Sequence, residues 1–292
     1  MITTQSPPRD VVISTPDGLS LRGWHWTRPN PRGVLVIGHG FGEHGGCYRH
    51  VAEGLGPALE VEILSPDLRG HGRSPGRRGV VKQYEDLISD LRSAVVWARR
   101  GQPGLPIYLL GHSNGGQLAL RLALEPDVAL DGVIVSNPSL KVATRVARHK
   151  LLIGRFLRQF APGVTLGAKL NAAILTSDPD MQREHQIDPL RHSRITAPLY
   201  FGMVEGGQIV ADRAAEFEVP LLMILGGLDE VIDPEQSRLV FERISSTDKT
   251  LLIFPKMLHE PLNELGREQV FADIISWLNP RLDQRQSRSL DF

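Results

Sequence analysis

The chain has 292 residues, with 33 basic and 33 acidic side chains, so its formal net charge is zero. Hydrophobic residues make up 41% of the chain and charged residues 23%. These values are ordinary for a globular protein and exclude a mainly disordered, collagenous or coiled-coil chain. Because the charges balance, no surface-wide attraction for nucleic acid is expected.

The chain contains a single cysteine, Cys47. This excludes an intrachain disulfide and a zinc cluster of several thiolates, and it fits a reducing compartment. The first ten residues, MITTQSPPRD, lack the basic start and apolar centre of a secretory signal. No apolar run approaches the roughly 18 residues that span a bilayer. We therefore expect a cytoplasmic protein, with peripheral membrane contact as an open alternative.

Short runs rich in valine, isoleucine and leucine predict strands along most of the chain. The first two, Asp10–Thr15 and Leu19–Trp26, flank Asp17-Gly18, a pair typical of a tight hairpin. Six further runs alternate too little for half-exposed strands, which indicates strands covered on both faces, as in a parallel sheet. These runs are Val34–Gly38, Val61–Ser65, Ile107–Leu110, Gly132–Val135, Leu221–Leu225 and Thr250–Phe254.

Helical periodicity occupies several gaps between these runs. In Tyr84–Arg100, apolar residues recur at three- and four-residue spacing. Gly115–Leu124, Pro234–Ile244 and Arg267–Leu278 are further predicted helices. Strands that alternate with helices predict an α/β fold with right-handed crossovers. We expect an eight-stranded, mostly parallel sheet with helices on both faces.

One interval, Pro138–Val219, contains no clear buried strand. A structureless loop of that length is implausible in a compact domain, so we expect a mostly helical cap over one end of the sheet. The predicted organisation is a core of residues 1–137 and 220–280, a cap of residues 138–219, and a flexible polar tail of residues 281–292.

The motif Gly111-His112-Ser113-Asn114-Gly115 fits the pattern G-x-S-x-G. A predicted strand precedes it and a predicted helix follows it, as a nucleophile elbow requires. The glycines allow a tight strand-to-helix turn that exposes the serine hydroxyl at the carboxyl end of the sheet. The sequence therefore predicts Ser113 as a nucleophile.

A serine hydroxyl needs an adjacent base, and the base needs an orienting acid. In this chain order the acid and then the histidine should each follow a strand. Asp229 follows Leu221–Leu225, and His259 follows Thr250–Phe254. Asp233 is the rival acid, but it directly precedes a proline at a predicted helix start, which is typical of an N-cap.

An oxyanion needs two fixed N–H donors, one after the nucleophile and one from an earlier loop. The segment His39-Gly40-Phe41-Gly42 follows the strand Val34–Gly38. We therefore predict the backbone amides of Phe41 and Asn114 as the two donors, with Gly40 letting the backbone approach the substrate.

Four segments together resemble the monoacylglycerol lipase and lysophospholipase branch of the α/β-hydrolases. They are His39–His44, Asp67–Ser74, Gly111–Gly116 and Pro255–Glu260. The resemblance implies the α/β-hydrolase fold and a serine esterase for single-chain acyl esters that uses no metal and no cofactor. Two positions depart from the family: Asn114 stands where relatives often carry methionine, and Cys47 stands where an arginine is usual.

Substrate contacts are expected on both sides of this site. Glu43 and His44 are candidates for binding the leaving group, although both could instead brace the loop. The basic, amphipathic stretch Lys141–Phe160 carries apolar residues that could line a channel for one acyl chain. These residues are Ile153, Phe156, Leu157 and Phe160. A basic amphipathic helix can also lie on a membrane surface, so transient membrane contact through the cap stays open.

The leading prediction is an intracellular serine hydrolase for monoacyl lipids, with a small acyl ester as its partner and no nucleic acid. Two other functions remain compatible with the sequence. The same triad could serve a small ester, a thioester, a peptide or an acyl transfer, or the fold could belong to a non-catalytic ligand receptor. The sequence leaves the oligomeric state open.

Overall fold

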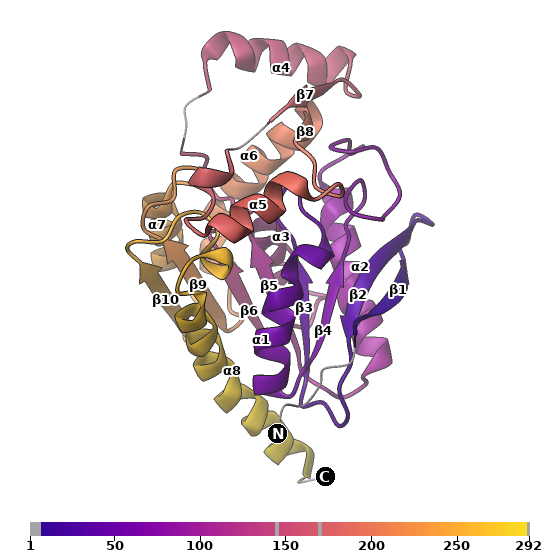
Figure 1. The fold of residues 1–292 in the computed structure, drawn as a ribbon, viewed down its shortest axis with the longest axis vertical. Coiled ribbons are helices and arrows are strands. Elements are labelled where there is room, and N and C mark those ends of the chain that lie inside the picture. The colour runs from indigo at the N-terminus through magenta and orange to yellow at the C-terminus, as the bar shows by residue number, and fades with distance from the viewer. Residues whose placement is uncertain (1–6, 144–145, 169–170, 291–292) are drawn as a thin grey trace.

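An eight-stranded sheet forms the centre of the computed structural model, which describes residues 7–143, 146–168 and 171–290 (Figure 1). The strand order is β1-β2-β4-β3-β5-β6-β9-β10. The strands are β1 (Arg9–Ser14), β2 (Ser20–Trp26), β3 (Val34–Gly38), β4 (Glu62–Pro66), β5 (Ile107–His112), β6 (Gly132–Ser136), β9 (Leu221–Gly226) and β10 (Lys249–Phe254). All eight predicted strands are present, with no end shifted by more than two residues.

The sheet is mostly parallel, as predicted. Only β1 with β2 and β2 with β4 pair antiparallel, while the remaining pairs are parallel. The six strands that follow the hairpin were predicted to be covered on both faces, and this prediction is wrong for β10. This strand lies at the sheet edge and is only partly buried, with Ile253 48% exposed.

Helices cover both faces of the sheet. On one face, α1 (Arg49–Leu59) and α8 (Arg267–Leu290) pack with the 3₁₀ turns η1 (Gly45–Tyr48) and η4 (Pro261–Asn263). On the other, α2 (Glu85–Gly101), α3 (Asn114–Ala123) and α7 (Pro234–Arg243) contribute to a second core cluster. The sequence did not predict α1, because Gly54, Gly56 and Pro57 interrupt its pattern.

The last helix continues beyond Pro280, where a flexible tail was predicted. Helix α8 extends to Leu290, Leu282 is fully buried, and Arg281 forms an ion pair with Asp248. Burial of the leucine stabilises a turn that its polar neighbours alone do not favour. The expectation of a frayed tail is therefore wrong at its start. Residues 291–292, like the N-terminal residues 1–6, lie outside the described part of the chain.

The residues between β6 and β9 are mostly helical. They contain α4 (Arg148–Phe160), α5 (Pro179–Ile187) and α6 (Ala197–Asp212), the turns η2 (Ala172–Ile174) and η3 (Ala214–Glu216), and a small antiparallel sheet of β7 (Thr165–Gly167) and β8 (Arg194–Thr196). We refer to this insertion as the cap.

Two parts of the cap differ in how they meet the core. Helix α6 lies close to α3, since a Cβ on Gly206 would collide with the Gln117 side chain. Helix α4 stands at the far end of the molecule, at the top of Figure 1, and none of its residues is buried. Among the described residues, no helix is both long and apolar enough to cross a membrane.

Candidate active site

Ser113 lies in a sharp turn between β5 and α3, at the carboxyl end of the sheet. Its backbone has φ 51° and ψ −116°, an uncommon conformation for a residue with a side chain. The turn fits only because its neighbours are small: a Cβ on Gly115 would collide with the carbonyl oxygen of Gly38. These features are those of the predicted nucleophile elbow.

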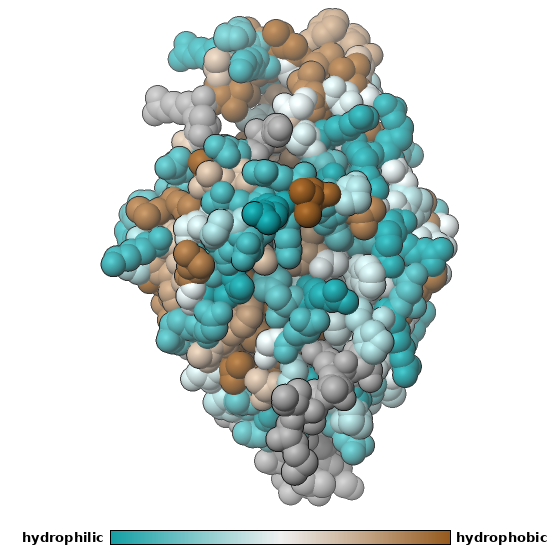
Figure 2. Space-filling model, viewed as in Figure 1, coloured by the Kyte–Doolittle hydropathy of each residue, from teal (hydrophilic) through white to brown (hydrophobic). Residues whose placement is uncertain are grey.

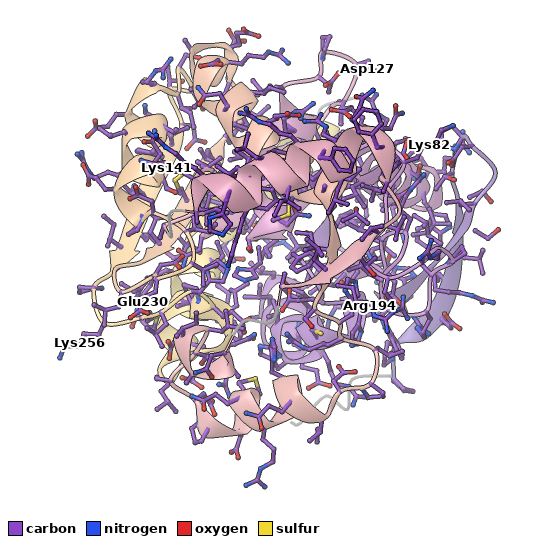
Figure 3. The ribbon with its side chains drawn as sticks, turned by 90° about the horizontal axis from the view of Figure 1, so that it is seen from above. Lys82, Asp127, Lys141, Arg194, Glu230 and Lys256 are labelled. Atoms are coloured by element: carbon purple, nitrogen blue, oxygen red, sulfur yellow. The ribbon has the colours of Figure 1, made fainter. Side chains whose placement is uncertain are left out.

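A chain of two hydrogen bonds links the three residues that the sequence predicts as a triad. Ser113 Oγ lies 3.0 Å from His259 Nε2, and His259 Nδ1 lies 2.8 Å from Asp229 Oδ2. All three side chains are buried. They come from the ends of β5, β9 and β10, so the sheet brings together residues that are distant in the sequence. Figure 3 shows Glu230 and Lys256, from the loops that carry the acid and the histidine, on the same side of the molecule.

The acid is fixed on its other side by backbone donors. Asp229 Oδ1 accepts hydrogen bonds from the N–H groups of Val231 at 2.7 Å and Ile232 at 2.9 Å. The rival acid, Asp233, instead caps helix α7 and forms an ion pair with Lys141. Asp229, and not Asp233, is therefore the carboxylate that is hydrogen-bonded to His259.

The pKa of His259 is raised above its ordinary value of about 6.5. Burial alone would lower this pKa, but the hydrogen bond and the charge of Asp229 outweigh burial. The imidazole is therefore a stronger base than an isolated histidine and is suited to taking the serine proton.

The two predicted oxyanion donors lie on adjoining turns. Phe41 follows β3, and Asn114 is the first residue of α3, so its amide belongs to a helix N-terminus that favours negative charge. The Asn114 side chain is engaged elsewhere, since its Oδ1 accepts a hydrogen bond from Tyr84. His39 braces the first turn by accepting from the N–H of Leu68 at 3.0 Å.

The loop Asp67–Ser74 stabilises the site without reaching the nucleophile. Asp67 accepts from the N–H groups of Gly45 and Arg73, both within 2.9 Å. Arg69 forms an ion pair with the buried Asp90. These contacts hold the loop against η1 and α2.

The two predicted leaving-group residues, Glu43 and His44, are bound mainly to protein. Glu43 accepts from the N–H of Gly40 and from the hydroxyl of Tyr48, and it also lines the catalytic cavity. His44 is hydrogen-bonded to Asp188 at 2.7 Å and lines neither of the cavities described below. These contacts favour the second role considered for both residues, which is to brace the loop, while Glu43 also remains a candidate for contact with the substrate.

Two cavities meet at the site. One, of about 160 Å³, is lined by Ser113 and His259 and by mostly apolar side chains. Its apolar residues include Val142, Leu175, Ile195, Met203, Val231 and Ile232. The other, of about 710 Å³, is lined mainly by polar residues of the cap. The two share Phe41, Ala168, His185 and Arg191, so the cavities adjoin.

The four cap residues predicted to line an acyl channel lie elsewhere. Ile153, Phe156, Leu157 and Phe160 are on α4, and none of them lines either cavity. Ile153, Phe156 and Phe160 are 56%, 61% and 70% exposed. The prediction that they line the channel is wrong, because α4 lies away from both cavities and leaves most of these side chains exposed, with Leu157 half-buried.

Among the described residues, one group has side chains that could hold a metal ion: His44, Cys47 and Asp188. His44 Nδ1 accepts from the N–H of Gly46, so the ring proton lies on Nε2 and points to Asp188. A metal on Nε2 would shift that proton to Nδ1, against another donor. Burial raises the pKa of Cys47 to about 12, which disfavours a thiolate ligand. The group therefore acts as a hydrogen-bonded cluster.

Two residues of the site were not predicted from the sequence. Asn137 follows β6 with φ 41° and bonds to the loop that carries His259. The dipeptide Asn137-Pro138 is a turn signal that could have marked it. Arg191 lines both cavities and forms an ion pair with Glu43. No local pattern marks a contact between residues so far apart in the chain.

The fold and the site define a serine hydrolase of the α/β-hydrolase superfamily. The family model described as "Serine aminopeptidase, S33" matches residues 29–266. A monoacylglycerol lipase of Mycolicibacterium smegmatis is 32% identical, over 87% of this chain and 90% of its own. Human monoglyceride lipase is 30% identical, over 95% of this chain and 96% of its own.

A solved structure agrees with these relatives. The crystal structure of Paleococcus ferrophilus monoacylglycerol lipase matches with a TM-score of 0.81 and 29% identity, over 89% of this chain and 99% of that chain. The chain belongs to the monoacylglycerol lipase branch of the α/β-hydrolase superfamily. It is a carboxylic-ester hydrolase, and a non-catalytic receptor on the same fold is not supported.

Proposed function

We propose that the protein hydrolyses monoacylglycerols through an acyl-enzyme formed on Ser113. The observation that carries the proposal is the hydrogen-bonded chain from Ser113 through His259 to Asp229, beside an apolar cavity that adjoins a polar one. The relatives that are named monoacylglycerol lipases support this substrate class.

In the first half-reaction, Ser113 Oγ attacks the ester carbonyl carbon while His259 Nε2 accepts the hydroxyl proton. Asp229 holds the imidazole in orientation and stabilises its charged form. The amides of Phe41 and Asn114 donate to the carbonyl oxygen as it becomes negative. His259 then returns the proton to the leaving glycerol oxygen as the carbon–oxygen bond breaks.

In the second half-reaction, water loses a proton to His259 and attacks the acyl carbon. Ser113 Oγ leaves, takes the proton back from His259, and the fatty acid is released. No step needs a metal or a cofactor.

The two cavities divide the substrate between them. The acyl chain begins among Leu175, Ile195 and Met203 in the apolar cavity, and the glycerol lies toward His185 and Arg191 in the polar one. One apolar cavity accommodates one chain, so a triacylglycerol should be a poor substrate.

A chain-length series of monoacylglycerols below the critical micelle concentration tests this function. Each buried methylene contributes about 0.8 kcal/mol, or nearly fourfold, until the apolar cavity is filled. We therefore expect kcat/KM to rise to a medium or long chain and to exceed that for triacylglycerols. A fall from acetyl esters upward would indicate a small-ester hydrolase. Faster turnover of a thioester or an aminoacyl amide, tested in parallel, would indicate a thioesterase or a peptidase.

A matched pair of variants locates the acyl chain. Ile195→Ala enlarges the apolar cavity and should change the preferred chain length. Ile153→Ala alters a residue of the same type that is exposed on α4, and it should leave the preference unchanged on substrates dissolved as monomers. If Ile153→Ala changed the preferred chain length and Ile195→Ala did not, the acyl chain would instead bind along α4.

We further propose that the cap binds membranes transiently through α4. Leu152, Ile153, Phe156 and Phe160 are exposed apolar residues of one helix, and Figure 2 shows apolar surface in the uppermost part of the molecule, where α4 lies. Basic side chains share the helix, at Arg148, Lys150 and Arg155. This combination suits an interface with anionic lipid.

Sedimentation with lipid vesicles tests the membrane contact. The protein should bind vesicles of phosphatidylcholine with phosphatidylglycerol more tightly than phosphatidylcholine alone. The Phe156→Ser/Phe160→Ser variant should lose binding while it retains activity on a short soluble ester. Unchanged binding of the variant would contradict the proposal.

A further inference from the structure

The cap segment Asp188–His192 is attached directly to the loop that carries Phe41. The N–H of His192 donates to the carbonyl oxygen of Gly42 at 2.9 Å, and His44 is hydrogen-bonded to Asp188 at 2.7 Å. Arg191 Nη1 lies 3.3 Å from Glu43 Oε1. The candidate oxyanion loop is therefore held by the cap and by the core together.

Glu43 connects the cap to the backbone of this loop. Its Oε2 accepts from the N–H of Gly40 at 2.8 Å and from the hydroxyl of Tyr48 at 2.7 Å. Gly40 directly precedes Phe41, so the carboxylate fixes the peptide next to the predicted oxyanion donor. Only an ionised carboxylate can accept both of these bonds and still attract a cation on its other oxygen.

The cation that faces Glu43 comes from the cap. The side chains of Arg191 and Glu43 are 12% and 5% exposed, so the pair is shielded from solvent. Cys47 lies beside the pair: burial raises the pKa of its thiol, the Arg191 guanidinium lowers it and the Glu43 carboxylate raises it further. The guanidinium that pairs with Glu43 thus comes from the cap and not from the loop that carries Glu43.

We propose that Arg191 is a positioning residue for ester hydrolysis: it keeps Glu43 ionised and in place, and Glu43 in turn fixes the backbone amide of Phe41. The inference rests on the proposed role of Phe41 as an oxyanion donor. A closed cap then completes the oxyanion site, so that full activity requires the cap segment to be seated on the core.

The charges around Glu43 agree with this role. Burial alone would raise the pKa of Glu43, but the Arg191 guanidinium, together with His112 and the bonds from Tyr48 and Gly40, holds it well below its usual range. Removal of Arg191 takes away the largest of these favourable contributions. The groups that face Glu43 or interact with it are Arg191, His112, Tyr48, Gly40, His39, Cys47, His185 and His259.

The test compares Arg191→Met, Arg191→Lys, Glu43→Gln and the double variant Arg191→Met/Glu43→Gln on a short p-nitrophenyl ester. This ester needs Ser113, His259 and the oxyanion site but no glycerol group, so the result stands even if monoacylglycerols are not substrates. Arg183→Met, an exposed arginine of α5, is the control. Circular dichroism and the Tm check that each variant is folded.

We expect Arg191→Met to lower kcat at least tenfold with KM changed less than threefold, since a misplaced oxyanion donor slows the chemical step. Arg191→Lys should recover part of the loss. The double variant should be no worse than Glu43→Gln alone, because both changes act through one carboxylate. Arg183→Met should match the parent protein.

Two further measurements separate positioning from a structural effect. As the pH falls from 8 to 5, the ratio of parent kcat to Arg191→Met kcat should grow, because Glu43 gains a proton more easily without its cation. Measured against a Glu43→Gln background, the same substitution should give a constant ratio. Introducing Cys47→Arg into Arg191→Met should restore kcat at least fivefold by supplying a guanidinium from the loop.

Several results would overturn the proposal. They are a kcat for Arg191→Met within twofold of the parent, a loss confined to KM, multiplying losses in the double variant, or a pH-dependent ratio in the Glu43→Gln background. If Arg191→Met does not fold, the kcat values of Arg191→Lys and of the double variant Cys47→Arg/Arg191→Met test the proposal in its place.

Discussion

Asn137 donates its side-chain amide to the carbonyl oxygen of His259 at 2.8 Å. Its Oδ1 accepts from the N–H of Gly226 at 2.8 Å, at the end of β9. A single buried side chain thus ties the end of β6 to the strand that precedes the acid and to the loop that carries the base. Asparagine tolerates the positive φ found here better than most residues.

Asn137→Ala should lower the free energy of unfolding by about 1–3 kcal/mol, because buried backbone groups lose their partner. It should also lower kcat several-fold, since the histidine loop is no longer held. Denaturant unfolding and steady-state kinetics measure the two effects. Asn279 lies on α8 and accepts a partly buried hydrogen bond from Arg32, so Asn279→Ala is the control and should leave kcat unchanged. Equal kcat values for the two variants would contradict the role of Asn137.

Ser113→Ala and His259→Ala should each lower kcat by roughly 10³-fold or more, and the double variant should be little worse than either. Residues that act as one unit lose their common function once. Single-turnover kinetics on an activated ester measure the losses. Losses that multiply in the double variant would mean that the two residues act independently.

Asp229→Asn should lower kcat severely, though less than Ser113→Ala does, because the imidazole loses its orienting carboxylate and its tautomer. Asp233→Asn is the matched control: asparagine is an equally good N-cap, so helix α7 is retained and activity should stay close to that of the parent. A severe loss in Asp233→Asn with little loss in Asp229→Asn would reverse the assignment of the acid.

The pH dependence of kcat/KM should show an acid limb with an apparent pKa above 6.5, the ordinary value for histidine. His259 must be neutral to accept the serine proton, and its pKa is raised by Asp229 despite burial. Activity is therefore lost as the pH falls through this raised value. The limb should move to lower pH in Asp229→Asn. A profile flat from pH 5 to 9 would mean that the base is not His259 or that the chemical step does not limit the rate.

The fold was predicted where patterns are local. Strands β3 and β5 read as continuous apolar runs because both faces are covered, and that pattern predicted a parallel sheet. The same pattern could not show that β10 lies at the sheet edge, since strand order depends on crossovers. Helix α1 was missed because its packing against α8 outweighs the low helix propensity of its glycines and Pro57.

In the candidate site too, residues that follow a local pattern were predicted, and contacts between distant segments were not. Ser113 directly follows a strand, and Asp229 and His259 lie in the loops that follow two others, so the general geometry of a parallel sheet was enough to predict that they meet. For α4, periodicity predicted an apolar side but not what that side faces, and the acyl-channel residues were assigned wrongly. The contact of Arg191 with Glu43 joins the cap to the core and has no local signal.

The edge position of β10 has a consequence for how the enzyme loses activity when it begins to unfold. This strand carries the loop with His259, yet it pairs with β9 alone and is only partly buried, whereas Ser113 follows the central, fully buried β5. Regions with fewer buried contacts open at a smaller free-energy cost than the whole domain. Heat or denaturant would therefore inactivate the enzyme by local unfolding of β10, which moves His259 away from Ser113 while Ser113 and most of the sheet are still in place.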